Sequence, residues 1–369
     1  MKRYVSLDVL RGLTVAMMIV VNNPGSWSKI YPMLRHASWD GCTPCDLVFP
    51  FFLFCVGVSM AFALAKYAAL NADALKKILK RGVLLYLVGL LLTAFPFYPA
   101  HMDPSMSFWQ NWLEWASGIR LVGVLPRIAM CYVLASVLAL CLKSSEKIAC
   151  AIGVLSILHV GLLLLFGGPE GALTLEGNFA RKIDLAVFGE SHIYHGYGIP
   201  FDPEGLLGVL TGTCTVLIGY LIGRSIRNGG SEQSQTDVSA RTFVISAALL
   251  LTGLAFSIII PLNKPLWSVS YVFYTAGWAS FVLALLIYLI DYKGWEKPFF
   301  PFKALGMNAL ALYVLSALLM VINWRYIGWD YTAVFGSTKF LSLVFALLYM
   351  LLHLAIAVIM YKKKIFIKL

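Results

Sequence analysis

A polar stretch from His36 to Pro50 lies between two strongly apolar runs and contains the side chains best suited to chemistry. It combines His36 with two carboxylates, Asp40 and Asp46, and with helix-breaking residues. Histidine readily moves a proton near neutral pH, and a neighbouring carboxylate can orient its ring. Asp46 could alternatively serve only as the cap of the helix that follows it. We predict that His36 has a functional role and that this stretch forms one mouth of a site.

Further polar residues precede or open apolar runs at what we predict to be the same mouth. Asp202 and Glu204 come just before one such run, and Lys264 lies at the start of another. Carboxylates can hold polar groups of a substrate, although Asp202 and Glu204 could instead favour the dipole of the next helix. Arg120 could simply extend its charge to the membrane surface. The predicted substrate-binding set is Trp39, Asp40, Arg120, Asp202, Glu204, Lys264 and Trp267.

A second group of polar residues is basic. Arg11, Arg81 and Lys303 lie near the ends of three other predicted helices, and Asn308 lies about a turn and a half beyond Lys303. Arginine forks match phosphate oxygens, so such a group can bind a nucleotide or anionic lipid headgroups. The alternative for Arg11 is a local ion pair with Asp8, three residues earlier on one helix.

The elements that must position these residues are membrane-spanning helices. The 369 residues are 60% hydrophobic and only 13% charged, and apolar runs of about 20 residues recur throughout the chain. We predict an all-α polytopic membrane bundle of about ten transmembrane helices, with residues 1–369 forming one domain. The predicted helices are Leu7–Asn23, Asp46–Lys66, Ile78–Phe95, Leu121–Leu142, Ile148–Phe166, Gly205–Arg224, Thr242–Leu262, Trp267–Asp291, Lys303–Asn323 and Leu341–Tyr361.

The distribution of basic residues predicts the orientation of this bundle. The net charge is +11, and most of the 29 Lys and Arg residues fall in loops on the side of the two termini. This bias places both termini in the cytoplasm and His36 on the opposite side, and it argues against nucleic-acid binding. Long connections over residues 24–45, 96–120 and 167–204 then lie outside and are expected to be ordered walls of a site, although Trp109, Trp112 and Trp115 could be interfacial anchors. We expect residues 228–239 to form a flexible cytoplasmic linker.

The seven cysteines do not indicate a metal site. Cys55, Cys131 and Cys214 lie within apolar runs and are expected to be buried packing residues. Cys42 and Cys45 form a C-x-x-C pair, but no second pair at zinc-ligand spacing accompanies them. We therefore expect no metal and assign the pair no role.

Two classes of function fit a basic mouth and a histidine-carboxylate mouth on opposite sides of a membrane. One is a transferase that takes an activated donor inside and modifies an acceptor outside. The other is a proton-coupled sugar transporter, in which histidine and carboxylates relay protons.

Motifs along nearly the whole chain resemble the heparan-α-glucosaminide N-acetyltransferase family, including its bacterial relatives of the NagX type. They are SLDVLRG at residues 6–12, VN at 21–22, HASWDG at 36–41, DLVFP at 46–50, GVLPR at 123–127, FDPEG at 201–205, NKPLWSVSY at 263–271, GMN at 306–308 and YKKKIF at 361–366. The C-x-x-C pair is not part of the family pattern.

The resemblance implies a transmembrane enzyme that uses cytoplasmic acetyl-CoA to N-acetylate a glucosamine or terminal glucosaminide on the far side. The family's catalytic histidine corresponds to His36 and its nearby asparagine to Asn22, and we place Asp46 with them as the third catalytic residue. The predicted acetyl-CoA contacts are Ser6, Arg11, Arg81, Arg127, Lys303 and Asn308. We also expect the bacterial inner membrane as location, contacts with membrane lipid, and a homodimer. The animal lysosomal members carry an extra luminal region and one more helix before the SLDVLRG motif, whereas this chain begins at the motif, so a free or short amino sugar is the expected acceptor. An O-acetyltransferase acting on cell-envelope glycans is the alternative within the transferase class.

Overall fold

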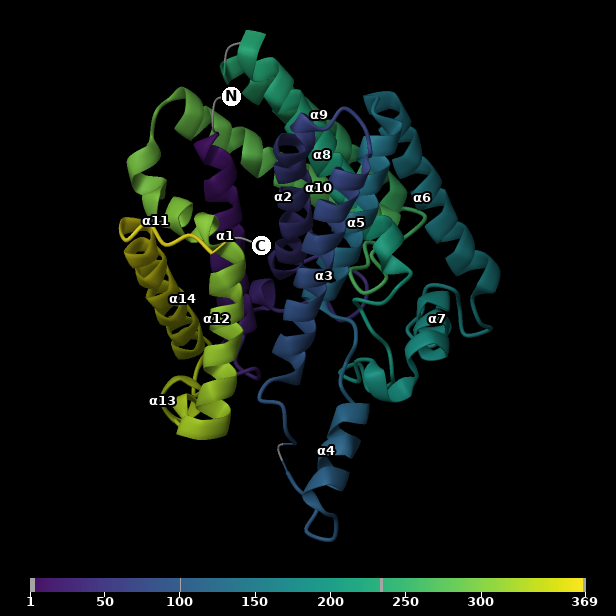
Figure 1. Ribbon diagram of the computed structural model, residues 1–369, viewed down its shortest axis with the longest axis vertical. Helices are drawn as coiled ribbons and strands as arrows, with labels where there is room; N and C mark the ends of the chain where they lie inside the picture. Colours follow the sequence, from purple (N-terminus) through teal and green to yellow (C-terminus); the bar gives the residue numbers. More distant parts are fainter. Residues whose placement is uncertain (1–3, 100, 233–234, 368–369) are drawn as a thin grey trace.

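The computed structural model describes residues 4–99, 101–232 and 235–367, and in these residues every regular element is a helix. Figure 1 shows long helices running side by side, with the shorter helices α4, α7 and α13 at the end of the bundle opposite the N-terminus. The α-helices are α1 (Val5–Asn22), α2 (Val48–Ala63), α3 (Ala72–Ala94), α4 (Phe108–Ser117), α5 (Val124–Leu142), α6 (Ser145–Phe166), α7 (Phe179–Phe188), α8 (Gly208–Glu232), α9 (Gln235–Ser257), α10 (Val269–Leu286), α11 (Glu296–Met307), α12 (Ala309–Ile322), α13 (Tyr331–Phe335) and α14 (Lys339–Lys362). Shorter helical turns are η1 (Pro32–Leu34), η2 (Pro44–Leu47), η3 (Leu64–Lys66), η4 (Glu190–His192), η5 (Ile287–Tyr292) and η6 (Asn323–Ile327).

In this part of the chain, nine helical segments are long and apolar enough to cross a membrane. The predicted class, a polytopic helical membrane protein, is therefore confirmed. The segment predicted as Ile78–Phe95 falls outside this set, although α3 has 23 residues, because Lys77, Lys80 and Arg81 make its first half strongly charged. It nevertheless packs along α5, as a tenth span would (Figure 1).

Two expectations about local structure were wrong. The predicted linker over residues 228–239 is helical in its described residues, since α8 continues to Glu232 and α9 begins at Gln235. The predicted helix Lys303–Asn323 is interrupted at Asn308, which separates α11 from α12. The long connections contain α4, α7 and η4, as expected of ordered segments.

Glycines let the central helices approach one another closely. A Cβ atom added to Gly12 of α1 would overlap the carbonyl of Phe302 in α11, and one added to Gly306 would overlap the carbonyl of Asp8. Gly57 of α2 faces the backbone of α8 in the same way. Small residues that allow backbones to meet are a common basis of helix packing in membranes, where the hydrophobic effect contributes little.

This close approach predicts that Gly306→Ala destabilises the bundle. The added methyl group must push α1 and α11 apart, and overpacking of this kind costs about 1–3 kcal/mol or more. Thermal unfolding in detergent should show a clearly lower midpoint for this variant. Gly153→Ala on α6 is the matched control, because its Cβ would meet no atom within 4 Å. Equal midpoints for the two variants would contradict the close contact.

Candidate functional site

His36 lies on the connection between α1 and α2, and its ring is held beside a carboxylate. Its Nδ1 atom is 2.7 Å from Oδ1 of Asp46, which is 1% exposed, whereas the His36 side chain is 50% exposed. When Nδ1 carries the proton and donates it to Asp46, the lone pair of Nε2 can accept a proton, and Lys264 Nζ lies 3.4 Å from Nε2. That is the arrangement in which a carboxylate orients a histidine for general-base chemistry at Nε2.

Asp46 is fixed by a set of hydrogen bonds that follows from its place at the start of η2. Its Oδ2 atom accepts from the backbone N–H groups of Thr43 and Ala37, at 3.0 and 3.1 Å, and from the Thr43 hydroxyl. Its own backbone carbonyl accepts a hydrogen bond from the hydroxyl of Tyr271, on α10. Asp46 thus caps the helix and also orients His36, so both of the roles that the sequence allowed for it are present.

Lys264 and Cys45 complete the group around the His36 ring, and we call these four residues the histidine cluster. Lys264 Nζ is 3.0 Å from His36 Nδ1 and 3.4 Å from Asp46 Oδ1, although 228 residues separate it from the histidine. Cys45 Sγ is 3.2 Å from the same ring nitrogen. The cation compensates the buried carboxylate, which keeps Asp46 in its charged, hydrogen-bond-accepting form.

The three charged residues predicted near the mouth form their own ion-pair network. Arg120 Nε donates to Asp202 Oδ2 at 2.7 Å, and its Nη2 atom donates to Glu204 as well as to Asp202. Burial alone would lower the pKa of Arg120, but the two carboxylates raise it above its ordinary value. The guanidinium is therefore engaged by protein groups, and it holds the loop that begins at Asp202.

Tyr197 connects this network to the histidine cluster. Burial raises its pKa, and the carboxylates of Glu204, Asp46 and Asp202 raise it further, so all three lie within electrostatic range of one phenol. Trp39 packs edge-on against the Tyr197 ring, with centroids 6.1 Å apart, and donates its indole N–H to the carbonyl of Leu173. The connections around residues 36–46 and 194–204 thus meet at one end of the bundle.

Several residues predicted to contact the substrate have partners inside the protein. Asp40 accepts a hydrogen bond from Asn263 at 3.1 Å, so it joins the two connections, although the residue remains exposed. Trp267 is fully buried and lies 4.9 Å from the Arg127 guanidinium. Its indole N–H donates to the Thr215 hydroxyl at 3.2 Å. Trp267 was predicted as a sugar contact, and its fully buried ring leaves no exposed face for a sugar to stack on.

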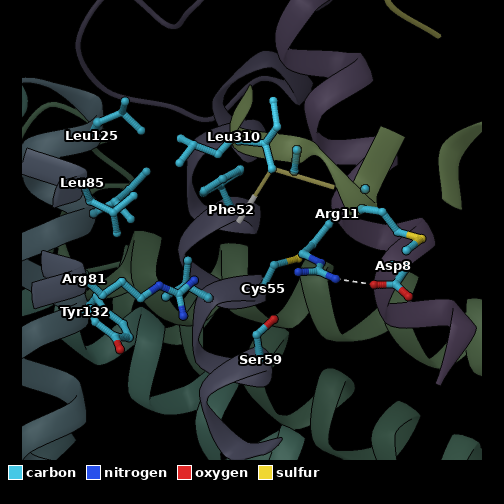
Figure 2. A pocket seen from close by; sticks show the side chains of 16 residues that line it. Asp8, Arg11, Phe52, Cys55, Ser59, Arg81, Leu85, Leu125, Tyr132 and Leu310 are labelled. Atoms are coloured by element: carbon cyan, nitrogen blue, oxygen red, sulfur yellow. Dashed lines mark hydrogen bonds and ion pairs between the residues drawn. The ribbon is translucent and has the colours of Figure 1, made fainter. Parts of the chain in front are cut away.

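A cavity of about 470 Å³ lies deeper in the bundle, between α1, α2, α3, α5 and the break between α11 and α12. We call it the arginine cavity, because Arg11 and Arg81 enter it from opposite sides (Figure 2). Its lining also includes Asp8, Phe52, Cys55, Val56, Ser59, Leu85, Leu125, Ile128, Tyr132, Gly306, Met307, Ala309, Leu310 and Ile367. This volume is typical of sites for small molecules.

The arginine cavity has a polar end and an apolar end. Figure 2 shows Arg81, Ser59, Arg11 and Asp8 around one part and leucines with Phe52 around the other. Arg11 pairs with Asp8, and the Arg81 guanidinium stacks 5.0 Å from the Tyr132 ring. The Nε atoms of both arginines are nevertheless buried without a hydrogen-bond partner among the described residues. These two donors can bind an acceptor at the polar end of the cavity, and the opposite end can hold an apolar group.

One helix connects the two features. Phe52, Cys55 and Ser59 of α2 line the cavity at helical spacing, and Asp46 lies just before the same helix. At about 1.5 Å per residue, Phe52 lies about 9 Å along the axis from Asp46, and Ser59 about 20 Å. The histidine cluster therefore lies beyond the apolar end of the arginine cavity.

The other predicted donor contacts lie elsewhere. Arg127 is 1% exposed and donates to the carbonyls of Pro203 and Gly205. Lys303 pairs with Glu296 at 3.3 Å. Ser6 is buried, its backbone N–H lies 3.4 Å from Asp291, and none of these three residues lines the cavity. Both polar atoms of the Asn308 side chain bond to backbone groups.

Asn22 is exposed at the end of α1 and makes no side-chain hydrogen bond in the described part of the chain. The structure therefore leaves its amide available but does not join it to the histidine cluster.

Cys55, Cys131 and Cys214 are buried as expected. Cys42 and Cys45 are free thiols, and burial raises the pKa of Cys42 to about 12.

The sequence did not predict that four residues belong to these two sites, namely Tyr271 beside Asp46 and Tyr132, Cys55 and Ser59 in the cavity wall. Spacing gave a signal for the last two, because positions 52, 55, 56 and 59 share one face of a helix. The two tyrosines act through partners more than 50 residues away in sequence, so local spacing carried no information about them. One buried carboxylate was also missed. Asp184 accepts a hydrogen bond from the Leu206 N–H at 2.9 Å, and burial raises its pKa to about 7.

Taken together, the helices and the two polar groups define a polytopic membrane protein with a histidine-carboxylate pair near one end and a basic ligand cavity inside. Residues 3–173, which include His36, Asp46, Arg11 and Arg81, match the family model described as heparan-alpha-glucosaminide N-acetyltransferase, catalytic. The mouse protein named heparan-alpha-glucosaminide N-acetyltransferase is 26% identical over 98% of this chain and 60% of its own length. The human protein of that name is 27% identical over 99% of this chain and 59% of its own length.

These comparisons confirm the resemblance to the heparan-α-glucosaminide N-acetyltransferase family. The chain spans about three fifths of the length of the curated relatives it matches. In the described residues, no group of three or more His, Cys, Asp or Glu side chains is placed to hold a metal ion.

Proposed function

We propose that this protein is a transmembrane N-acetyltransferase that moves an acetyl group from acetyl-CoA to the amine of glucosamine or of a terminal glucosaminide. The observation that carries the proposal is the half-exposed His36–Asp46 pair next to the helix that also lines the arginine cavity. The relatives named above carry an N-acetyltransferase activity in their names, which supports the same reaction class.

The arginine cavity would receive the donor. Arg11 and Arg81 would hold phosphate oxygens, because their unsatisfied Nε atoms need an acceptor and guanidinium forks match phosphate. The apolar end formed by Phe52, Leu85 and Leu310 would accommodate the pantetheine arm. The thioester would then be directed along α2 towards the histidine cluster.

His36 would act as the general base. Its Nε2 atom accepts a proton from the sugar amine while the amine nitrogen bonds to the acetyl carbonyl carbon. The carbon–sulfur bond then breaks, and the proton passes to the departing thiolate. Asp46 holds the ring and stabilises the imidazolium formed in between. An acetylated His36 intermediate, with two half-reactions, uses the same residues and is distinguished by ping-pong kinetics.

The two substrates would approach from opposite sides. The basic-residue bias of the sequence places the arginine cavity towards the cytoplasm and His36 outside, across an apolar core of about 30 Å. A donor that carries several negative charges does not cross such a core unaided. Bacterial inner membrane and a free or short amino sugar remain parts of this proposal.

One assay tests the function. The purified, detergent-solubilised protein is incubated with acetyl-CoA and glucosamine, and N-acetylglucosamine is measured by mass spectrometry, with boiled protein as the control. We expect product formation and stoichiometric release of free CoA thiol. No product, together with proton-driven sugar uptake into reconstituted vesicles, would establish a transporter instead. Acetylation of glycan hydroxyls without reaction at a free amine would establish an O-acetyltransferase.

A further inference from the structure

The chain after α14 turns back and contributes a residue to the arginine cavity. The Lys364 N–H donates to the Tyr361 carbonyl, and the Ile365 N–H donates to that of Met360, which closes the turn. Figure 1 shows this segment leaving α14 and crossing towards the middle of the bundle. Ile367 then lies in the wall of the cavity, together with Arg11 and Met307.

Asn308 holds this segment through both polar atoms of its side chain. Its amide Nδ2 donates to the Ile365 carbonyl at 3.0 Å, and its Oδ1 accepts from the Ile367 N–H at 2.9 Å. The side chain therefore pairs with the segment as a neighbouring backbone would. Asn308 is 1% exposed, so bonds to it are shielded from water and costly to leave unmade.

Among the described residues, few other contacts anchor the end of this segment. Ile365 and Ile367 are 46% and 57% exposed, so apolar burial contributes little to their placement. The Phe366 ring does pack on that of Tyr361, with centroids 6.0 Å apart. The position of Ile367 at the cavity thus depends mainly on the Asn308 amide.

We propose that residues 363–367 form a retaining wall of the donor site, and that Asn308 is the positioning residue that keeps this wall closed over acetyl-CoA. The inference rests on the proposed function, because it takes the arginine cavity to be the donor site. It gives Asn308 a role through Ile367 instead of the direct donor contact predicted from the sequence. The exposed part of Ile367 would become buried against the donor on binding.

The wall predicts weaker donor binding in two variants. Binding of radiolabelled acetyl-CoA to the full chain in detergent should weaken at least fivefold in Ile367→Ala, which removes the lining side chain, and in Asn308→Ala, which removes both anchors. Asn308→Asp keeps an acceptor for Ile367 but loses the donor to Ile365, and should lie between wild type and Asn308→Ala. The matched control is Asn323→Ala, because Asn323 also donates to a backbone carbonyl, that of Trp329, at 3.0 Å but does not line the cavity.

Limited trypsin digestion gives a readout that is independent of activity. Acetyl-CoA should slow cleavage after the exposed residues Lys362 to Lys364 in the wild type, whereas glucosamine should not, and Asn308→Ala should be cleaved faster. If the wild type binds acetyl-CoA and Ile367→Ala binds it with the same affinity, the proposed wall is overturned and the proposed function is left intact. Absence of acetyl-CoA binding by the wild type would overturn both. If Asn308→Ala does not fold, Ile367→Ala decides alone, because its side chain is largely exposed.

Discussion

Replacing His36 with alanine is expected to reduce acetyl transfer to glucosamine by about 10³-fold at saturating substrates. The expectation follows from the loss of a positioned general base, which contributes about 10²–10⁴-fold in enzymes that use one. Asp46 cannot substitute, because it is buried, its Oδ2 atom is engaged by backbone N–H groups and by the Thr43 hydroxyl, and its Oδ1 atom lies 3.4 Å from Lys264 Nζ. The rate of N-acetylglucosamine formation by the purified variant is the measurement.

The same variant should bind acetyl-CoA normally and unfold at a similar temperature. His36 does not line the arginine cavity, and half of its side chain is exposed. His195→Ala is the matched control, since His195 is another exposed histidine on the connection that contains Tyr197. Wild-type turnover by His36→Ala would remove the histidine from the mechanism. An equal loss in His195→Ala would indicate a general effect on this end of the bundle.

Arg81→Ala is expected to raise the acetyl-CoA concentration needed for half-maximal rate by 10-fold or more. A hydrogen bond to a charged group contributes about 1.5–3 kcal/mol, and each 1.4 kcal/mol is a factor of ten in binding. The glucosamine requirement should hardly change, because Arg81 lies at the polar end of the cavity (Figure 2), and His36 is not part of the cavity lining. Initial rates with each substrate varied in turn measure the two effects.

The salt concentration and the side of the membrane on which substrates are supplied provide two further tests of the Arg81 prediction. High salt should increase the donor requirement of Arg81→Ala more than that of the wild type, because screening weakens the remaining attraction by Arg11. Lys80→Ala is the control, since Lys80 is the adjacent cation on α3 but is exposed and outside the cavity lining. Equal losses for both substrates would place Arg81 outside the donor site. Activity of sealed right-side-out vesicles supplied with both substrates only externally would overturn the proposed sidedness.

Much of the fold could be predicted because membrane helices have a strong compositional signal. Apolar runs identified nine of the ten expected spans, and their ends were displaced by a few residues where caps such as Ser144 and Thr338 start the helices. The α8–α9 connection was misjudged, because its small polar residues are also compatible with helix when a long apolar segment continues into them. The interruption at Asn308 was hidden because the apolar pattern runs on through it.

The candidate site was predictable only in part. Residues in one short stretch, such as His36 and Asp46, could be paired from the sequence, and the structure brings Lys264 to them. Three residues predicted to contact a ligand instead have partners within the protein. Side chains that could bind a ligand instead donate hydrogen bonds to distant segments of the same chain in Arg127, Trp267 and Asn308. No local sequence pattern reveals such a partner.

Helix α2 and the turn before it carry both the carboxylate that orients His36 and one wall of the arginine cavity. A continuous hydrogen-bonded helix is stiff, so the distance between Asp46 and Ser59 does not change when surrounding loops move. We therefore expect α2 to hold the acceptor and the donor at a fixed separation. The length of the donor's flexible arm then decides whether the acyl group reaches His36. On this view, the length of the donor arm would limit the reaction more strictly than the identity of the sugar.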